Sequence, residues 1–199
     1  MTYLSRSSML LMLALLGACA AAPLTPAGAD WQTNRDALTA LDNWQLRGKL
    51  AVVTQDSADS VNVNWNQQGA ITHLILSGPI GWGRASINSD GQTLQLERNG
   101  ETSTVMLDDE RALVRLLGWP MPVALLPWWI RGLPAPDLPV DVLELQQGQL
   151  RVLSQQGWQL TYERYQPVGE LQLPSKIRFR SEGAEGKILI KQWLPDPTP

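Results

Sequence analysis

Apolar and polar side chains alternate along much of the sequence from residue 44 onward. In the clearest example, Val61, Val63 and Trp65 alternate with asparagines, and residues 94–97 and 176–180 repeat the pattern. Such alternation is typical of β-strands that have one face in water. Turn signals separate these segments at Gln68-Gly69, Asp90-Gly91, Asn99-Gly100, Gln147-Gly148, Gln156-Gly157 and residues 183–186. Consecutive hairpins predict an antiparallel meander, in which the Asp-Gly and Asn-Gly pairs suit type I′ turns.

The pattern predicts about eleven strands, more than a strongly twisted open sheet holds without curling. We therefore expect a mainly β fold, either a barrel or a strongly curved half-barrel, and not a two-sheet sandwich. Two segments have helical periodicity instead. The first begins at Asp30, which suits an N-cap, and extends to about Asp42. The second covers residues 108–117, has acidic residues in its first turn, and ends at Gly118.

The segment at residues 119–134 is nearly all apolar, and Arg131 is its only charged residue. Pro122 suits the first position of a helix and Gly132 suits a C-cap, whereas Pro127 between them would break or kink a helix. We expect a short, bent helical piece. Its apolar surface must either pack as ordinary core or cover an open barrel and contact a ligand.

The first nineteen residues have the features of a secretory signal. Arg6 supplies positive charge, and residues 9–16 form an apolar run. That run is too short to cross a bilayer, for which roughly 20 residues are needed. It is followed by Gly17, Ala18 and Cys19, and with Leu16 these residues resemble the bacterial lipobox. The alternative is ordinary cleavage, with Cys19 as an unmodified bystander.

The lipobox resemblance implies a division of the chain and a location for it. Residues 1–18 are a signal peptide, and residues 19–30 comprise the lipidated cysteine and a flexible tether. We expect the remainder, residues 31–199, to form a single β-barrel domain. Among lipoproteins of this kind, Asp after the cysteine causes retention in the inner membrane, and here that residue is Ala20. We therefore expect anchoring through Cys19 to the periplasmic face of the outer membrane.

Composition excludes several classes of function. The 199 residues, 44% of them hydrophobic, suffice for one core. A formal net charge of −3 argues against a nucleic-acid partner. One cysteine and one histidine argue against a metal site, and the sequence has no Gly-x-Ser-x-Gly motif. We expect no metal, no cofactor and no enzymatic activity, and we interpret His73 as a structural residue within a strand.

A second apolar feature is the turn at residues 77–83, where glycine and proline surround Ile80 and Trp82. Loop tips usually carry polar residues. These two side chains are therefore either exposed for a purpose or folded back to plug the end of the barrel. The nine tryptophans against one phenylalanine also suggest a pocket lining or an interface as well as a core.

Four motifs stand out: Arg47-Gly48-Lys49-Leu50, Gly78-Pro79-Ile80-Gly81, Gly118-Trp119-Pro120-Met121-Pro122 and Trp129-Ile130-Arg131-Gly132-Leu133-Pro134. Together they resemble the LolB family of outer-membrane lipoprotein receptors, and the resemblance extends from the lipobox to Trp193. The resemblance implies an eleven-stranded, half-closed antiparallel barrel with a helical lid over an apolar cavity. It also implies a receptor, which we expect to be a monomer, that takes lipoproteins from the periplasmic carrier LolA and places them in the outer-membrane lipid.

Carried over to this sequence, the resemblance assigns Ile80, with Trp82 beside it, to a loop that delivers cargo to the membrane. The expected acyl-binding cavity and lid comprise Leu113, Leu117, Trp119, Leu125, Leu126, Trp128, Trp129 and Ile130. Two other functions remain open at this point. The chain could be a lipoprotein barrel that stores or senses a small apolar ligand, or a structural lipoprotein that links the membrane to an envelope partner.

Overall fold

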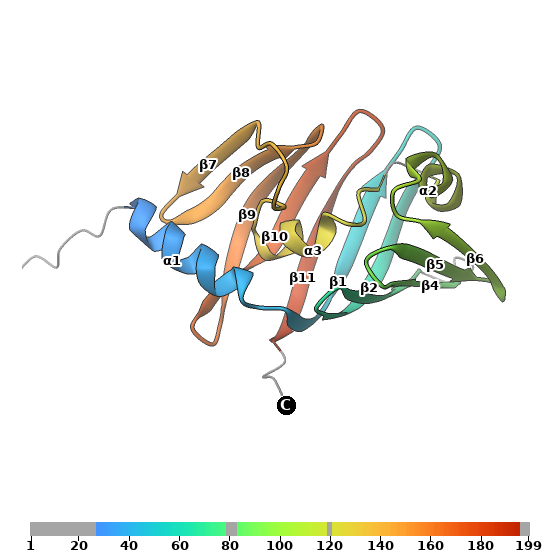
Figure 1. Ribbon diagram of the computed structural model, residues 1–199, viewed down its shortest axis with the longest axis horizontal. Coiled ribbons are helices and arrows are strands. Elements are labelled where there is room, and N and C mark those ends of the chain that lie inside the picture. Colours follow the sequence, from blue (N-terminus) through green and yellow to red (C-terminus); the bar gives the residue numbers. More distant parts are fainter. Residues whose placement is uncertain (1–26, 79–82, 119–120, 196–199) are drawn as a thin grey trace, which may run out of the picture.

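A computed structural model describes residues 27–78, 83–118 and 121–195 of the chain. Within them, eleven strands form one antiparallel sheet in the order β6-β5-β4-β3-β2-β1-β11-β10-β9-β8-β7 (Figure 1). The strands are β1 (Asn43–Val53), β2 (Ala58–Gln68), β3 (Ile71–Ser77), β4 (Arg84–Ser89), β5 (Thr93–Arg98), β6 (Glu101–Met106), β7 (Val142–Gln146), β8 (Gln149–Gln155), β9 (Trp158–Val168), β10 (Leu171–Arg180) and β11 (Glu185–Pro195). The predicted half-barrel and the number of strands are therefore confirmed.

The sheet is open because its two edge strands, β6 and β7, do not pair with each other. They are consecutive in the sequence, so the chain between them, residues 107–141, has to cross from one edge of the sheet to the other. We call residues 107–141 the lid segment. It contains α2 (Glu110–Leu117) and α3 (Leu126–Arg131), and α3 lies across the inner face of the sheet in Figure 1.

The predicted alternation determines which face of each strand is buried. On β2, Val61, Val63 and Trp65 are buried, whereas Asn62 and Asn64 are exposed. Burial of one row of apolar side chains fixes the strand register, because a slip of one residue would turn the whole row outward. The inner face of the curved sheet is thus apolar and its outer face is polar.

Three of the predicted turn pairs have positive φ at both positions, as type I′ turns require: Asn99-Gly100, Gln147-Gly148 and Gln156-Gly157. The prediction of a type I′ turn at Asp90-Gly91 is wrong, because Gly91 has a positive φ of 90° and Asp90 does not have a positive φ. The Asp90 carboxylate instead accepts hydrogen bonds from the backbone N–H groups of Gln92 (2.9 Å) and Thr93 (2.7 Å). These bonds form an Asx-type turn and lower the pKa of Asp90.

The helices begin at residues that differ from those expected. Helix α1 (Ala27–Thr39) starts before Asp30, so Asp30 is not its N-cap, and it ends earlier than Asp42. The residues before Trp31 are small and have no apolar period from which a helical turn could be predicted. Helix α2 starts two residues after the predicted position, and the Asp109 side chain caps it by accepting from the N–H of Ala112 at 2.9 Å.

Helix α3 shows why Pro127 does not kink a longer helix. The helix begins at Leu126, not at Pro122, so Pro127 lies in its first turn. A residue in the first turn has no intrahelical acceptor for its N–H, and the missing proton of proline therefore costs nothing there. Gly132 ends the helix with a φ of 85°, which confirms the predicted C-cap.

The guanidinium of Arg131 connects α3 to α1. Arg131 is buried, and its Nη1 donates to the carbonyl oxygens of Leu38 (2.9 Å) and Leu41 (2.6 Å), while Nε donates to that of Pro127 (2.9 Å). The guanidinium carbon also lies 4.8 Å from the ring centroid of Trp128. Burial lowers the pKa of Arg131. Because removal of one partner leaves buried polar groups unsatisfied, these bonds hold the two helices together strongly.

A second polar cluster holds the lid segment to β8 and β9. The Gln155 side chain is fully buried; its Oε1 accepts from Trp129 Nε1 and from the N–H of Ala135, both at 2.9 Å. The Tyr162 hydroxyl donates to the carbonyl oxygen of Trp129 at 2.9 Å, and burial raises the pKa of this tyrosine well above its ordinary value. Helix α3 is therefore fixed in position by groups from two neighbouring strands.

Candidate functional site

A cavity of about 600 Å³ lies between the inner face of the sheet and the lid segment. This volume is within the range of roughly 300–1,000 Å³ that is typical of small-ligand pockets. The sheet lines it with Leu50, Val52, Val61, Val63, Trp65, Leu74, Leu76, Ala85, Ile87, Leu96, Trp158, Leu160, Ile177, Phe179 and Ile188. These are the inward members of the alternating pattern, so the fold itself produces an apolar container.

The lid segment forms the other wall of the cavity. Of the residues expected there, Leu117 of α2 and Leu126, Trp129 and Ile130 of α3 line the cavity. Four residues that were not predicted as lining also contribute: Leu116, Gly118, Met121 and Pro122.

The other expected lid residues have different positions. Leu113 and Leu125 are not among the lining residues; Leu113 is buried in the hydrophobic core, and Leu125 packs against it. Trp128 is also outside the lining, because its ring packs against the core and under the guanidinium of Arg131. Trp119 lies outside the described residues. Helical periodicity identified the apolar face of the lid, but it does not separate side chains facing the cavity from those facing solid core.

One end of the cavity is polar. Its lining there consists of Thr54, Asp56, Ser57, Asp59 and Arg98, which we call the polar mouth. The Thr54 hydroxyl oxygen accepts from the N–H groups of Asp56 and Ser57, and the Ser57 hydroxyl donates to Asp59 Oδ2 at 2.8 Å. The cavity is therefore amphipathic, with an apolar body and a polar opening. Such a space suits a long apolar group that ends in a polar head.

Tryptophans occupy the opposite end. The ring centroids of Trp65 and Trp193 lie 5.0 Å and 5.2 Å from that of Trp44, and Trp44 is almost completely buried. Trp193 Nε1 donates to the carbonyl oxygen of Pro174 at 2.8 Å. Three of the unusually numerous indoles thus close the end of the barrel away from the polar mouth.

The described residues contain no group of three or more potential ligands that could hold a metal ion. His73 lies on the outer face of β3, where its Nδ1 is hydrogen-bonded to Asn88 Oδ1. No helix among the described residues has the length and hydropathy to span a membrane.

Cys19, Ile80 and Trp82 lie outside the described residues. The strands that flank the loop with Ile80 and Trp82 are described, and the N–H of Gly78 donates to the carbonyl oxygen of Gly83 at 3.2 Å, closing the base of the loop. Because the strands alternate in direction, this base lies at the same end of the sheet as the β1–β2 loop, which contributes to the polar mouth.

Solved structures with similar folds support the architecture. A LolA superfamily protein from Nitrosomonas europaea superposes with a TM-score of 0.55 at 9% identity, over 88% of this chain and 96% of that one. A domain from Vibrio parahaemolyticus described as a "putative outer membrane lipoprotein-sorting protein domain" gives a TM-score of 0.54 at 8% identity, over 87% of this chain and 95% of that one. At this identity the likeness concerns the fold alone.

Sequence comparison is more specific. The family model described as "Outer membrane lipoprotein LolB" matches residues 42–193. The outer-membrane lipoprotein LolB of Pseudomonas fluorescens is 34% identical over 84% of this chain and 82% of its own length. That of Tolumonas auensis is 30% identical over 97% and 98%. The chain forms a half-open barrel with an amphipathic cavity, and it is similar to these proteins over most of its length. It therefore belongs to the LolB family of outer-membrane lipoproteins.

Proposed function

We propose that this chain accepts lipoproteins from the soluble carrier LolA and inserts them into the outer membrane, holding their acyl chains in the cavity under the lid segment. The observation that carries the proposal is the amphipathic cavity of about 600 Å³ in a member of the LolB family. Acyl chains would fill the apolar body, and the polar head of the lipoprotein would remain at the polar mouth. The proposed cycle makes and breaks no covalent bond.

The energetics of acyl chains explain why a receptor is needed. Exposing a chain of about fifteen methylenes to water costs about 12 kcal/mol, at roughly 0.8 kcal/mol each. Release from the carrier into water followed by capture would therefore be very slow, and transfer has to pass directly from one cavity to the other. Cargo moves forward because the receptor binds it more tightly than the carrier does and the bilayer holds it more tightly than the receptor.

We further propose that a lipid on Cys19 anchors the chain to the periplasmic face of the outer membrane. Because α1 starts at Ala27, only seven residues separate Cys19 from the first described helix. Even fully extended, seven residues reach no further than about 25 Å. The anchor would therefore keep the folded domain close to the bilayer that receives the cargo.

The cavity assignment is tested by two adjacent leucines of similar exposure. Leu126 lines the cavity and Leu125 does not. Leu126→Glu places a carboxylate in apolar surroundings, which costs more than the roughly 1–3 kcal/mol of an unpaired neutral polar group. Acceptance of labelled lipoprotein from the carrier should fall about tenfold or more, and Leu125→Glu should have a much smaller effect. Equal loss in both variants, at equal melting temperature, would place the cargo elsewhere.

The loop assignment is tested by Ile80→Glu. Burial of an isoleucine side chain in the membrane contributes roughly 1.5–3 kcal/mol, and a carboxylate would oppose entry instead. We expect an unchanged melting temperature and unchanged acceptance from the carrier, while insertion of cargo into liposomes falls at least severalfold. Ile80→Leu is the matched control and should insert normally. Lost stability with normal insertion per folded molecule would show that Ile80 plugs the barrel.

The anchor is tested by Cys19→Ala. The thiol is the only one in the chain, so the variant has no site for the lipid. It should fold normally and appear in the soluble periplasmic fraction, because the described hydrophobic core begins at Trp31 and does not involve Cys19. Fractionation and circular dichroism measure both results. A Cys19→Ala protein that stays firmly in the outer-membrane fraction would refute the lipid anchor.

A further inference from the structure

A second hollow, of about 400 Å³, lies on the outer face of the sheet, opposite the cavity. Three cationic side chains from three strands line it: Arg47 of β1, Arg84 of β4 and Lys191 of β11. Between them, β2 and β3 contribute the polar side chains of Asn62, Asn64 and Ser77. The proposed acceptance of lipoproteins uses none of these groups.

The hollow depends on an irregularity in the sheet. The register between β1 and β11 shifts after Arg47, so that Arg47 pairs with Gln192 and Gly48 with Ile190, which leaves Lys191 unpaired. This β-bulge directs Lys191 toward the same hollow as Arg47. The strands approach so closely that a Cβ on Gly48 would lie 2.3 Å from the carbonyl oxygen of Leu189. The close approach of the strands thus requires glycine at position 48, and Arg47 beside it lines the hollow.

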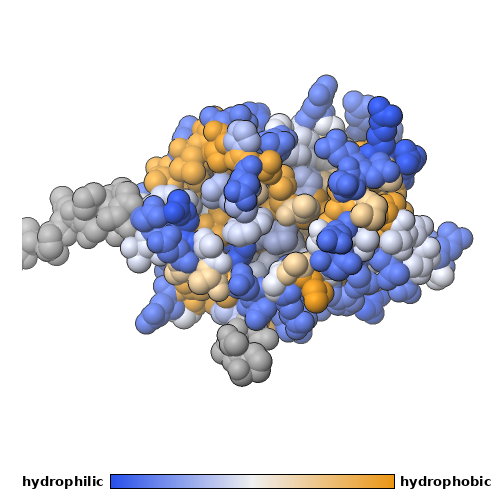
Figure 2. Space-filling view, in the orientation of Figure 1, coloured by the Kyte–Doolittle hydropathy of each residue, from blue (hydrophilic) through white to orange (hydrophobic). Residues whose placement is uncertain are grey.

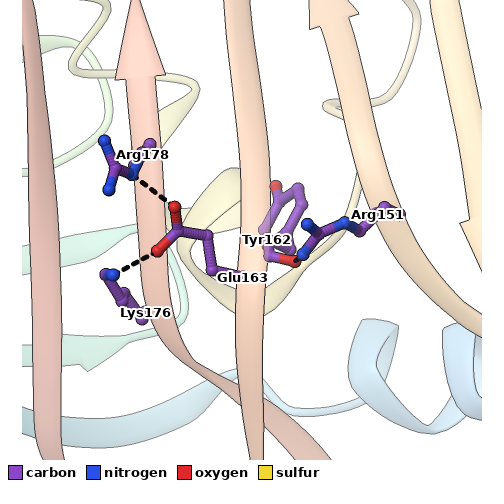
Figure 3. Close-up of polar contacts among 5 residues, drawn as sticks. All are labelled: Arg151, Tyr162, Glu163, Lys176 and Arg178. Atoms are coloured by element: carbon purple, nitrogen blue, oxygen red, sulfur yellow. Dashed lines mark hydrogen bonds and ion pairs between the residues drawn. The ribbon is translucent and has the colours of Figure 1, made fainter.

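Within the described part of the chain, the three cations lack an acidic partner of the kind that Lys176 and Arg178 of the same face possess. Glu163 on β9 forms ion pairs with both Lys176 and Arg178 of β10, and hydrogen bonding to Lys176 helps to lower its pKa (Figure 3). Among the described residues, no carboxylate lies within 4 Å of the side-chain nitrogens of Arg47, Arg84 or Lys191. Clustered like charges repel one another, and a bound anion would relieve that repulsion.

We propose that this hollow, with Arg47, Arg84 and Lys191, binds the phosphate group of phospholipids in the target membrane. Guanidinium, ammonium, amide and hydroxyl groups are the donors that phosphate oxygens accept from. The position favours a lipid over a free phosphate ion, because Ser77 and Arg84 are the end residues of the strands that flank the loop with Ile80 and Trp82. The assignment to the membrane rests on the proposed delivery role of that loop, since a loop inserted in the bilayer brings its base to the headgroups.

The test measures binding of the Cys19→Ala protein to vesicles of phosphatidylethanolamine with and without phosphatidylglycerol. The triple variant Arg47→Gln, Arg84→Gln, Lys191→Gln removes the three cations, and Arg84→Gln alone removes one. Each cation near an anionic surface contributes about fivefold to binding. We expect the triple variant to lose well over tenfold in affinity for the anionic vesicles, and Arg84→Gln alone to lose about fivefold.

The matched control removes the same charge from exposed cations outside the hollow, as Arg35→Gln, Arg111→Gln, Arg115→Gln. This control variant should lose at most twofold in affinity for the anionic vesicles. Equal losses in the two triple variants would overturn the site, because they would show general attraction to the surface. Melting temperatures in inorganic phosphate and in chloride, at equal ionic strength, distinguish a lipid phosphate from a free phosphate ion as the ligand. If phosphate raises the melting temperature of the parent but not of the first triple variant, while both variants bind vesicles equally, the ligand is a free phosphate and the lipid assignment is wrong.

The test of the phosphate site can fail or succeed independently of the proposed lipoprotein transfer. Transfer of cargo from carrier to receptor in vesicle-free solution depends on the cavity and should be the same in both triple variants and their parent. Failure of that transfer in the parent would contradict acceptance of lipoproteins, while vesicle binding would still decide the phosphate site.

Discussion

The structure depends on one constraint: the inner face of an unclosed sheet is apolar and has to be covered. The two edge strands β6 and β7 are consecutive in the chain, so the lid segment must cross the open side. Arg131, Gln155 and Tyr162 fix its α3 half through buried hydrogen bonds to α1, β8 and β9. With this cover in place, the sheet can remain open without exposing its core to water.

The lid segment does not fill the space between itself and the sheet. Protein interiors normally pack as densely as organic crystals, and unfilled apolar volume reduces stability. A chain that maintains about 600 Å³ between sheet and lid therefore forgoes stability that larger side chains would supply. Apolar surface also reaches the outside at Leu138, Val140, Val142 and Leu143, and Figure 2 shows it over β7 and β8. Asp141 and Glu144 interrupt that edge, as charges do on strands that must not pair with other chains.

Local chemistry made much of this fold predictable from the sequence. Alternation on β2 and the glycine pairs at the hairpins were sufficient to predict the strands. Gly118 and Gly132 were sufficient to predict where the two helices end. Both predictions succeed because burial and positive φ are local requirements. The apolar pattern placed both Trp128 and Trp129 in the cavity-and-lid set, but only tertiary packing separates Trp129, which lines the cavity, from Trp128, which packs against the core. The contacts of Gln155, and the placement of Arg47, Arg84 and Lys191 around one hollow, depend on strand register and on a bulge that no local pattern reveals.

The central claim, that the cavity takes acyl chains directly from a carrier, is tested most directly by a two-protein transfer measurement. Carrier loaded with a labelled lipoprotein is mixed with the Cys19→Ala protein without nucleotide or membrane, and the two proteins are separated and assayed for label. The account predicts that most of the label moves to this protein, and that mass spectrometry finds intact lipoprotein bound to it. Label that stays on the carrier, with only a free lipid or nothing bound in the cavity, would contradict it.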